Sequence, residues 1–198
     1  MINLEELLYN KVKSVIDTWL EDDIYAISFF VYSNELNSYK RFSNVTDFMI
    51  SYNTEKDCDG AELLSEERWN YAFWRQNITY IINTNQNDEM TKALFGWYSE
   101  NGIKNIGYED VSCIYDENMY YIGKGPVGYY ELLCIVSEVA KRLQLEGFIK
   151  QKFGKSIPII IHDLEYAWYS FEATKNGNPN HEADSFFTAM KEMGFILS

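Results

Sequence analysis

Apolar residues recur at intervals of three and four over the first twenty positions, and this spacing predicts an amphipathic helix. The apolar face of that helix comprises Leu4, Leu7, Leu8, Val12, Val15, Ile16, Trp19 and Leu20. The run IYAISFFVYS (24–33) is rich in β-branched and aromatic residues and predicts a strand. SYKRFS (38–43) follows the turn-like NELN, so we expect it to return as the second strand of a hairpin.

The middle of the chain alternates between strand-like and helix-like patterns. DFMISY (47–52) predicts a third strand, although the spacing of its apolar residues also fits a helix. A helical or irregular stretch then leads into the strand-like ITYIIN (78–83). Residues 87–102 predict a helix, because acids stand near the start of this stretch and Gly102 closes it.

The last third of the chain has the same mixed character. VSCIYDENMYYIG (111–123) predicts two short strands around a turn at DEN, and 127–146 predicts a central helix that Gly147 ends. SIPIIIHDLEYAWYSF (156–171) predicts one or two strands, and a final helix follows Pro179. No proline- or glycine-rich linker or repeat interrupts the sequence. We therefore expect one α+β domain over 1–198, with a mainly antiparallel sheet and helices packed against it.

Charge narrows the range of partners. Thirty acidic residues against 17 basic ones give a formal net charge of −13. A polyphosphate needs a basic binding surface, so we expect no binding to nucleic acid or to an anionic membrane surface. A basic protein partner is the kind of partner that this charge favours.

The chain has three cysteines, and none of them forms a C-x-x-C pair. An odd number of cysteines without such a pair is typical of reduced thiols in a cytoplasmic protein. The first ten residues carry acids where a signal peptide would carry positive charge, and no apolar run approaches the length of a membrane span. We therefore expect a soluble, cytoplasmic protein.

Gly123, Gly125 and Gly128 form a G-x-G-x-x-G pattern before a predicted helix, as in loops that bind dinucleotide phosphates. The preceding residues are too polar for a strand buried on both faces, and no acid follows a second strand at the expected distance. A tight turn explains the glycines equally well. Binding of a small ligand or nucleotide at the Gly123–Gly128 turn is therefore the alternative hypothesis, and no cofactor is expected.

The chain has two histidines, in HDLE (162–165) and HEAD (181–184), together with four carboxylates. His162, Asp163 and His181 could in principle serve a metal-dependent hydrolase, but H-E-x-x-H is absent and the sequence predicts no metal site. The G-x-S-x-G pattern that surrounds the nucleophile of many serine hydrolases is also absent. These patterns predict no catalytic residues, and they favour a protein that is not an enzyme.

Acidic residues concentrate in one segment that lies beside aromatic residues. Residues 55–67 hold six acids and one lysine, and two tryptophans and a tyrosine follow closely. Acids that steer a basic partner and aromatic side chains that dock it are a typical combination at protein interfaces. The predicted partner-binding residues are Asp57, Asp59, Glu62, Trp69, Tyr71 and Trp74. The alternative interpretation is that the acids are simply solvated and that the two tryptophans belong to the core.

Short motifs around this segment give a family resemblance. Asn53-Thr54-Glu55 follows a predicted strand, Arg68-Trp69 precedes a second tryptophan at Trp74, and Asn178-Pro179 precedes the last helix. In these motifs and in the order of its elements, the chain resembles the bacterial domain of unknown function 4303 family over nearly its whole length. Some members of that family look like immunity proteins that bind and block a toxin domain. The resemblance implies a similar role here and implies no catalytic residues.

Overall fold

The computed structural model of the 198-residue chain describes residues 2–33, 46–108, 114–164 and 166–196. The strands are β1 (Ile24–Ser33), β2 (Thr46–Thr54), β3 (Thr79–Ile82) and β4 (Ile159–His162). The helices are α1 (Leu4–Asp17), α2 (Glu66–Trp69), α3 (Glu89–Glu100), α4 (Tyr129–Leu145), α5 (Phe148–Phe153), α6 (Trp168–Gly177) and α7 (Asp184–Glu192), with a short 3-10 helix, η1 (Tyr71–Phe73).

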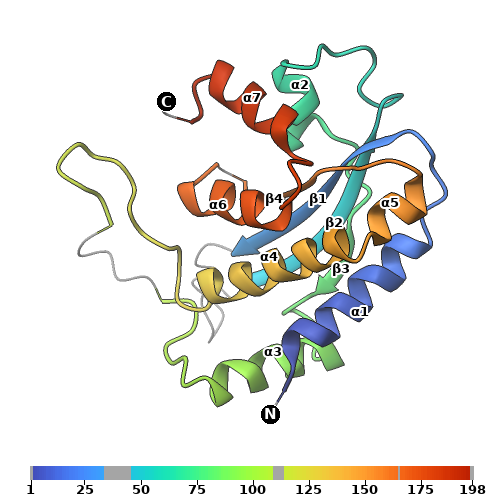
Figure 1. Cartoon of the computed structure of the whole chain (residues 1–198). Coiled ribbons are helices and arrows are strands. Elements are labelled where there is room, and N and C mark those ends of the chain that lie inside the picture. Colours follow the sequence, from blue (N-terminus) through green and yellow to red (C-terminus); the bar gives the residue numbers. More distant parts are fainter. Residues whose placement is uncertain (1, 34–45, 109–113, 165, 197–198) are drawn as a thin grey trace.

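The four strands form one sheet in the order β3-β2-β1-β4 (Figure 1). β1 pairs antiparallel with β2, and β2 pairs antiparallel with β3. β4 lies parallel to β1, with Ile159 opposite Ile27. The sheet is thus mostly antiparallel, and the prediction of an α+β fold is confirmed.

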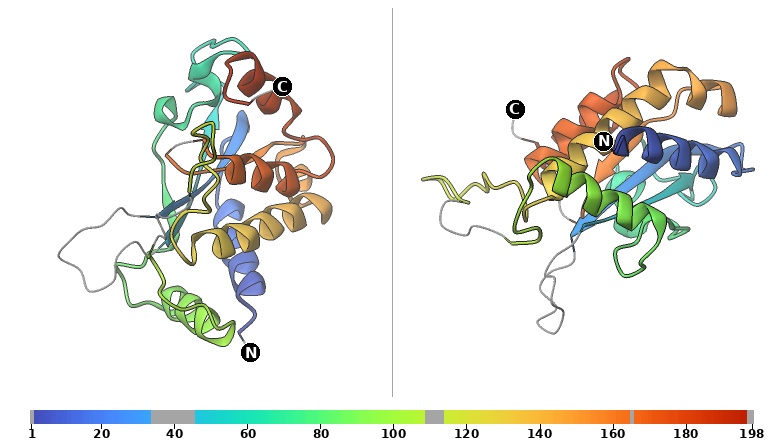
Figure 2. Two further views of the ribbon diagram at one scale, coloured as in Figure 1. Left: turned by 90° about the vertical axis from the view of Figure 1, so that its left-hand side faces the viewer. Right: turned by 90° about the horizontal axis from the view of Figure 1, so that it is seen from below.

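The two central strands are buried on both faces, which explains why β1 is apolar almost throughout. On one face Ile27, Phe29 and Val31 belong to the larger core, which also contains the buried sides of α1, α3 and α4. Figures 1 and 2 show α1 and α4 lying across this face of the sheet. Alternation along the strand sends the intervening residues to the opposite face.

A second, smaller core covers that opposite face. Tyr25 and Ile160 of the sheet are buried with Trp69 and with Phe186 of α7. The segment that follows β2 is therefore held between the sheet and the last helix, and this arrangement positions the acidic residues discussed below.

Side chains of α6 and of the residue after it bond the outer edge of β4. The hydroxyl of Thr174 accepts a hydrogen bond from Ile161 N and donates one to Ile161 O, each at 2.9 Å. The amide of Asn178 accepts from Ile159 N at 2.9 Å and donates to Ile159 O at 2.7 Å. These bonds satisfy backbone groups that an edge strand would otherwise leave open.

Most of the predicted elements are confirmed, and three predictions need correction. DFMISY is a strand, β2, and the helices over 87–102, 127–146 and 184–192 are present. Residues 111–123 were expected to form two strands, but the described part holds a single bridge between Tyr115 and Tyr121. A new helix, α5, starts directly after Gly147. The end of the stretch 156–171, predicted as one or two strands, is helical, because α6 begins at Trp168. The predicted strand at 38–43 lies outside the described residues.

Helix α6 was not predicted from the sequence, because long-range packing decides its structure. Its aromatic residues favour a strand intrinsically, yet a Cβ added at Gly177 would lie 3.0 Å from Ala140 Cβ of α4. The missing side chain allows the two helices to approach closely, and this contact stabilises the helical form.

Candidate interaction surface

The predicted binding residues lie on the segment that leaves β2 and crosses the second face of the sheet. A tight turn begins it: Asp57 N donates to Thr54 Oγ1 at 3.1 Å, and Thr54 Oγ1 donates to Asp57 Oδ2 at 2.8 Å. Asp57 also accepts a weaker bond from Arg75 at 3.4 Å. Asp57 therefore stabilises the turn as well as adding charge, and like Asp59 and Glu62 it is exposed.

An arginine clamp fixes the segment to the body of the protein. Both terminal nitrogens of Arg68 donate to the Glu55 carboxylate, at 2.8 and 2.6 Å. The guanidinium carbon lies 4.1 Å from the centre of the Tyr25 ring, so a cation–π contact adds to the ion pair. The neighbouring cation also lowers the pKa of the Glu55 carboxyl, chiefly through these hydrogen bonds.

Two of the three motifs that carry the family resemblance meet at this clamp, whereas Asn178 lies at the edge of β4. Asn53 donates to Tyr25 Oη at 2.9 Å and accepts from Arg75 N at 3.3 Å, while the next residues of the motif lead to Glu55. The carbonyl oxygen of Arg68 accepts bonds from Tyr25 Oη at 2.5 Å and from Trp74 Nε1 at 2.9 Å. In this chain the motif residues therefore hold the segment in place.

Trp69 and Trp74 were predicted to bind a partner, and the structure corrects this. They are only 2% and 4% exposed. Trp69 Nε1 donates to Leu63 O at 2.7 Å, and both rings pack edge-on against Tyr25. The second face of the sheet needs an apolar cover, and the two indoles provide it, so they are core residues. Tyr71 is half-buried, with burial raising its pKa to about 12.

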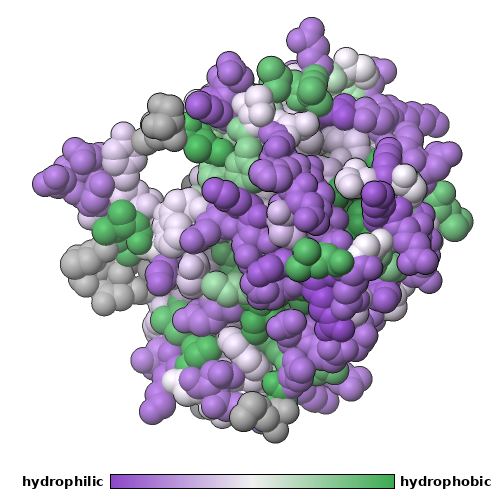
Figure 3. Space-filling model, in the orientation of Figure 1, coloured by the Kyte–Doolittle hydropathy of each residue, from purple (hydrophilic) through white to green (hydrophobic). Residues whose placement is uncertain are grey.

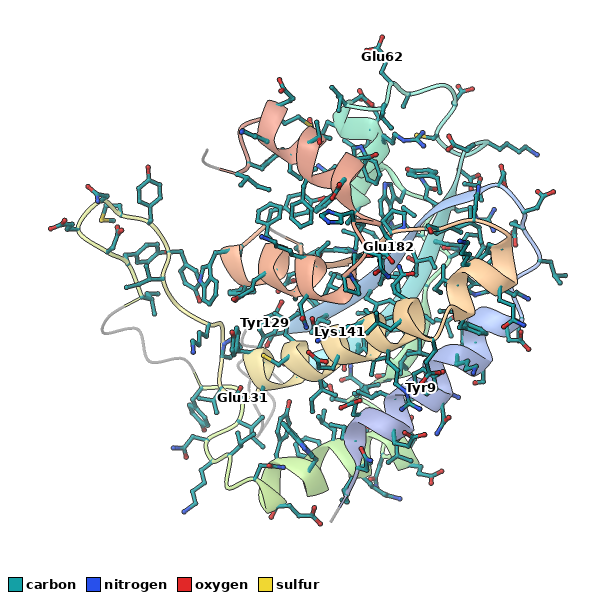
Figure 4. All side chains as sticks on the ribbon, viewed as in Figure 1. Tyr9, Glu62, Tyr129, Glu131, Lys141 and Glu182 are labelled. Carbon is teal, nitrogen blue, oxygen red and sulfur yellow. The ribbon has the colours of Figure 1, made fainter. Side chains whose placement is uncertain are left out.

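Three apolar side chains near the two tryptophans are exposed at the surface, although they were not predicted to bind a partner. Leu63, Leu64 and Phe73 are 55%, 43% and 55% exposed. We define the acidic face by seven exposed residues: Asp59, Glu62, Leu63, Leu64, Glu66, Glu67 and Phe73. In Figure 4 Glu62 points away from the body at the top of the molecule, and Figure 3 shows hydrophobic and hydrophilic atoms side by side at this edge. In the sequence, the pair Leu63-Leu64 within the acidic segment was the feature that could have indicated these exposed apolar side chains.

His162 lies below this segment, at the end of β4, and is 1% exposed. Its Nδ1 lies 3.0 Å from the carbonyl oxygen of Asp163, so this nitrogen carries the proton. The Ser28 hydroxyl then donates to Nε2 at 2.7 Å. The rings of Phe30 and Tyr71 flank the imidazole, and burial lowers its pKa to about 4. Both nitrogens are engaged, and the neutral ring is a structural part of the core.

The described residues give no support to the metal-hydrolase hypothesis. His162 is sealed inside the protein, whereas the side chain of His181 is 84% exposed and lies 3.3 Å from Asp184. Within residues 2–33, 46–108, 114–164 and 166–196, no three His, Cys, Asp or Glu side chains are grouped to hold a metal ion.

The glycine-rich turn is occupied by the protein's own side chains. The Glu131 carboxylate accepts a hydrogen bond from Gly128 N at 3.0 Å, and Tyr121 Oη accepts one from Gly125 N at 3.0 Å. Gly128 has φ +95°, and an added Cβ would lie 3.0 Å from the Tyr98 ring. Gly128 is therefore required by the turn and by packing, and two of the turn's amides, those of Gly125 and Gly128, are already bonded within the chain.

Comparisons with protein-family models, with curated proteins and with solved structures found no match to this chain. Among the described helices, none has the length and apolar character that a membrane crossing requires.

Proposed function

We propose that this chain is a cytoplasmic protein-interaction module that binds a basic protein through its acidic face. The observation that carries the proposal is the combination of exposed acids with exposed Leu63, Leu64 and Phe73 on a segment that the Arg68–Glu55 clamp holds in place. Charged residues speed the encounter with an oppositely charged partner, and desolvated apolar side chains supply most of the affinity.

Rigidity makes this segment suited to binding. Because the clamp and the buried indoles order it before a partner arrives, little conformational entropy is lost on association. The family resemblance suggests the kind of partner: a bacterial toxin domain that the chain would block, as an immunity protein does. The mechanism of such a protein is occlusion, and it needs no catalytic group and no cofactor.

The test begins with native mass spectrometry of the protein from its own host cells, which identifies a bound protein and its stoichiometry. Association with that partner is then measured by stopped flow at about 50 and 200 mM salt. The double variant Asp59→Lys/Glu62→Lys should associate at least tenfold more slowly at low salt, and the difference should shrink at high salt.

A matched control carries the same charge change elsewhere. Glu5→Lys/Asp22→Lys alters two exposed acids outside the acidic face, and it should slow association far less. Equal slowing by the two double variants would show that only net charge matters, and it would contradict a specific acidic face. An acidic or neutral partner would contradict the proposal altogether.

A further inference from the structure

A second exposed apolar feature lies well apart from the acidic face. Residues 114–124 form a narrow loop that projects from the body, seen as the yellow-green segment in Figure 1 and in the right-hand view of Figure 2. We call it the aromatic arm. Four of its side chains are exposed by half or more: Tyr115 (53%), Met119 (74%), Tyr120 (55%) and Ile122 (52%).

Hydrogen bonds give the arm a defined shape. Ile122 N donates to Ile114 O at 2.8 Å, and Asp116 N donates to Tyr120 O at 3.0 Å. At the tip, Asp116 Oδ1 accepts from the backbone amides of Asn118 and Tyr120, each at 2.8 Å. The exposed side chains are therefore presented by an organised turn, which lowers the entropic cost of binding.

The base of the arm is tied to the core. Trp168 Nε1 of α6 donates to Gly123 O at 3.0 Å. The ring of Tyr121 packs edge-on against Tyr115 and against Tyr169, a buried core residue. These contacts tie the base of the arm to α6.

The tip residue Met119 has a backbone conformation that its side chain disfavours. Its φ is +65°, in the left-handed region where glycine and asparagine are the usual residues. A large apolar side chain at such a position, 74% exposed to water, contributes little to the fold and costs conformational energy. This cost is understandable if the side chain serves binding.

The exposed area is a substantial part of an interface. A tyrosine side chain buries about 150–250 Å² when covered, so the half-exposed Tyr115 and Tyr120 offer on the order of 200 Å², and Met119 and Ile122 add further apolar area. The two tyrosines alone supply about a quarter of the area that one partner contributes to a standard protein–protein interface. The arm carries Asp116 and Glu117 and no basic residue between Lys104 and Lys124, so its field is negative.

We propose that the aromatic arm inserts its exposed apolar side chains into an apolar groove of the same basic protein partner, with lysine or arginine side chains at the groove's rim facing Asp116 and Glu117. This inference rests on the proposed function for the sign of the partner's charge. An anionic membrane would repel the arm, and a second copy of this chain carries the same charge of −13.

Basic residues are most frequent at 141–155, and two of them are already engaged within the chain. Arg142 bonds Glu6 and Glu146, at 2.6 and 2.7 Å, and Lys152 donates to Asp17 O at 2.5 Å. Together with the repulsion between two copies, this favours a different protein as the partner.

The experiment places a photo-crosslinking benzoylphenylalanine at Met119, at Glu62 or, as a control, at Lys11, an exposed residue of α1. Irradiation of the host cells should join positions 119 and 62 to one basic protein, and position 11 to none. Peptide mapping should place the position-119 adduct on an apolar surface of that protein with basic residues around it.

Binding of the identified partner is then measured with Met119→Asn/Tyr120→Ser, in which asparagine suits the backbone at position 119. We expect Kd to rise at least tenfold, mainly through faster dissociation, with unchanged thermal unfolding. The matched control is Leu20→Ser, which removes a 91% exposed apolar side chain outside the arm and should leave Kd unchanged.

Each other outcome contradicts a definite part of the proposal. If position 62 crosslinks but 119 does not, or the arm variant binds as tightly as the wild type, the arm is excluded and the acidic face stands. If 119 crosslinks to a basic protein whose association Asp59→Lys/Glu62→Lys does not slow, the acidic face is excluded and the arm stands. An acidic partner refutes both, and a crosslink to a second copy refutes the arm's role.

Discussion

Protonation of His162 should destabilise the fold between pH 7 and pH 5. The ring is 1% exposed, it accepts a hydrogen bond from Ser28, and burial lowers its pKa to about 4, against 6.5 for an ordinary histidine. Because the unfolded chain binds this proton more tightly than the native one, stability is full above pH 6.5. It is lost as the pH falls from 6.5 through 4.

The two pKa values set the size of the effect. For one group with these values, the linkage relation gives a loss of about 2 kcal/mol by pH 5 and about 3 kcal/mol by pH 4. The range from pH 7.5 to pH 5 isolates the histidine, because carboxyl groups of the unfolded chain titrate near 4. The net charge of −13 also changes with pH, so the effect must be read as a difference between variants.

Urea unfolding followed by tryptophan fluorescence at pH 7.5, 6.5, 5.5 and 5.0 makes the comparison. In His162→Gln the free energy of unfolding should be lower at pH 7.5, since packing and a bond are altered. It should then fall by about 2 kcal/mol less than in the wild type on going to pH 5. The control is His181→Gln, which makes the same substitution at an exposed histidine and leaves the core intact. Equal slopes for wild type and His162→Gln would refute a buried, neutral His162.

Three further predictions concern stability and are measured by the same unfolding assay. Asn178→Ala should cost about 3 kcal/mol or more, because it leaves buried backbone groups of β4 without partners, whereas exposed Asn180→Ala should cost less than about 1 kcal/mol. Trp69→Ala should cost about 3–5 kcal/mol and Phe73→Ala less than about 1 kcal/mol; similar costs would contradict the assignment of one to the core and the other to the surface. Gly128→Ala should destabilise by about 1–3 kcal/mol, since φ is +95°, and an unchanged stability would show that the turn adapts.

The elements that sequence predicts well are those decided locally. Helix α1 begins where the Asn3 side chain accepts from Glu6 N, and α3 begins where Asp88 accepts from Thr91 N. Both caps and both apolar faces can be seen in the sequence. Helix α6 differs because its stability depends on the close approach of Gly177 to α4, which involves residues almost forty positions away. No local pattern records such a contact.

The candidate site divides in the same way. Charge density predicted the exposure of Asp59 and Glu62, because isolated carboxylates are rarely buried. The sequence could not decide whether Trp69 and Trp74 lie in the core or at the surface, since this depends on the second face of the sheet being open for them. That face is covered because β1 and β2 are buried on both sides. The apolar run of β1 was visible in the sequence, but it was compatible with several ways of covering the second face.

The parallel pairing of β1 with β4 has a consequence for how the chain reaches its native state. More than 120 residues separate the two strands, so on the ribosome β1 emerges long before β4 can lie beside it. Until then one side of β1 has unpaired amides and carbonyls among apolar side chains, and the Thr174 and Asn178 bonds to β4 are also missing. We therefore expect folding to be slow for a protein of this size, because a distant closure completes the sheet. During synthesis, the half-made chain is the form that depends most on chaperones.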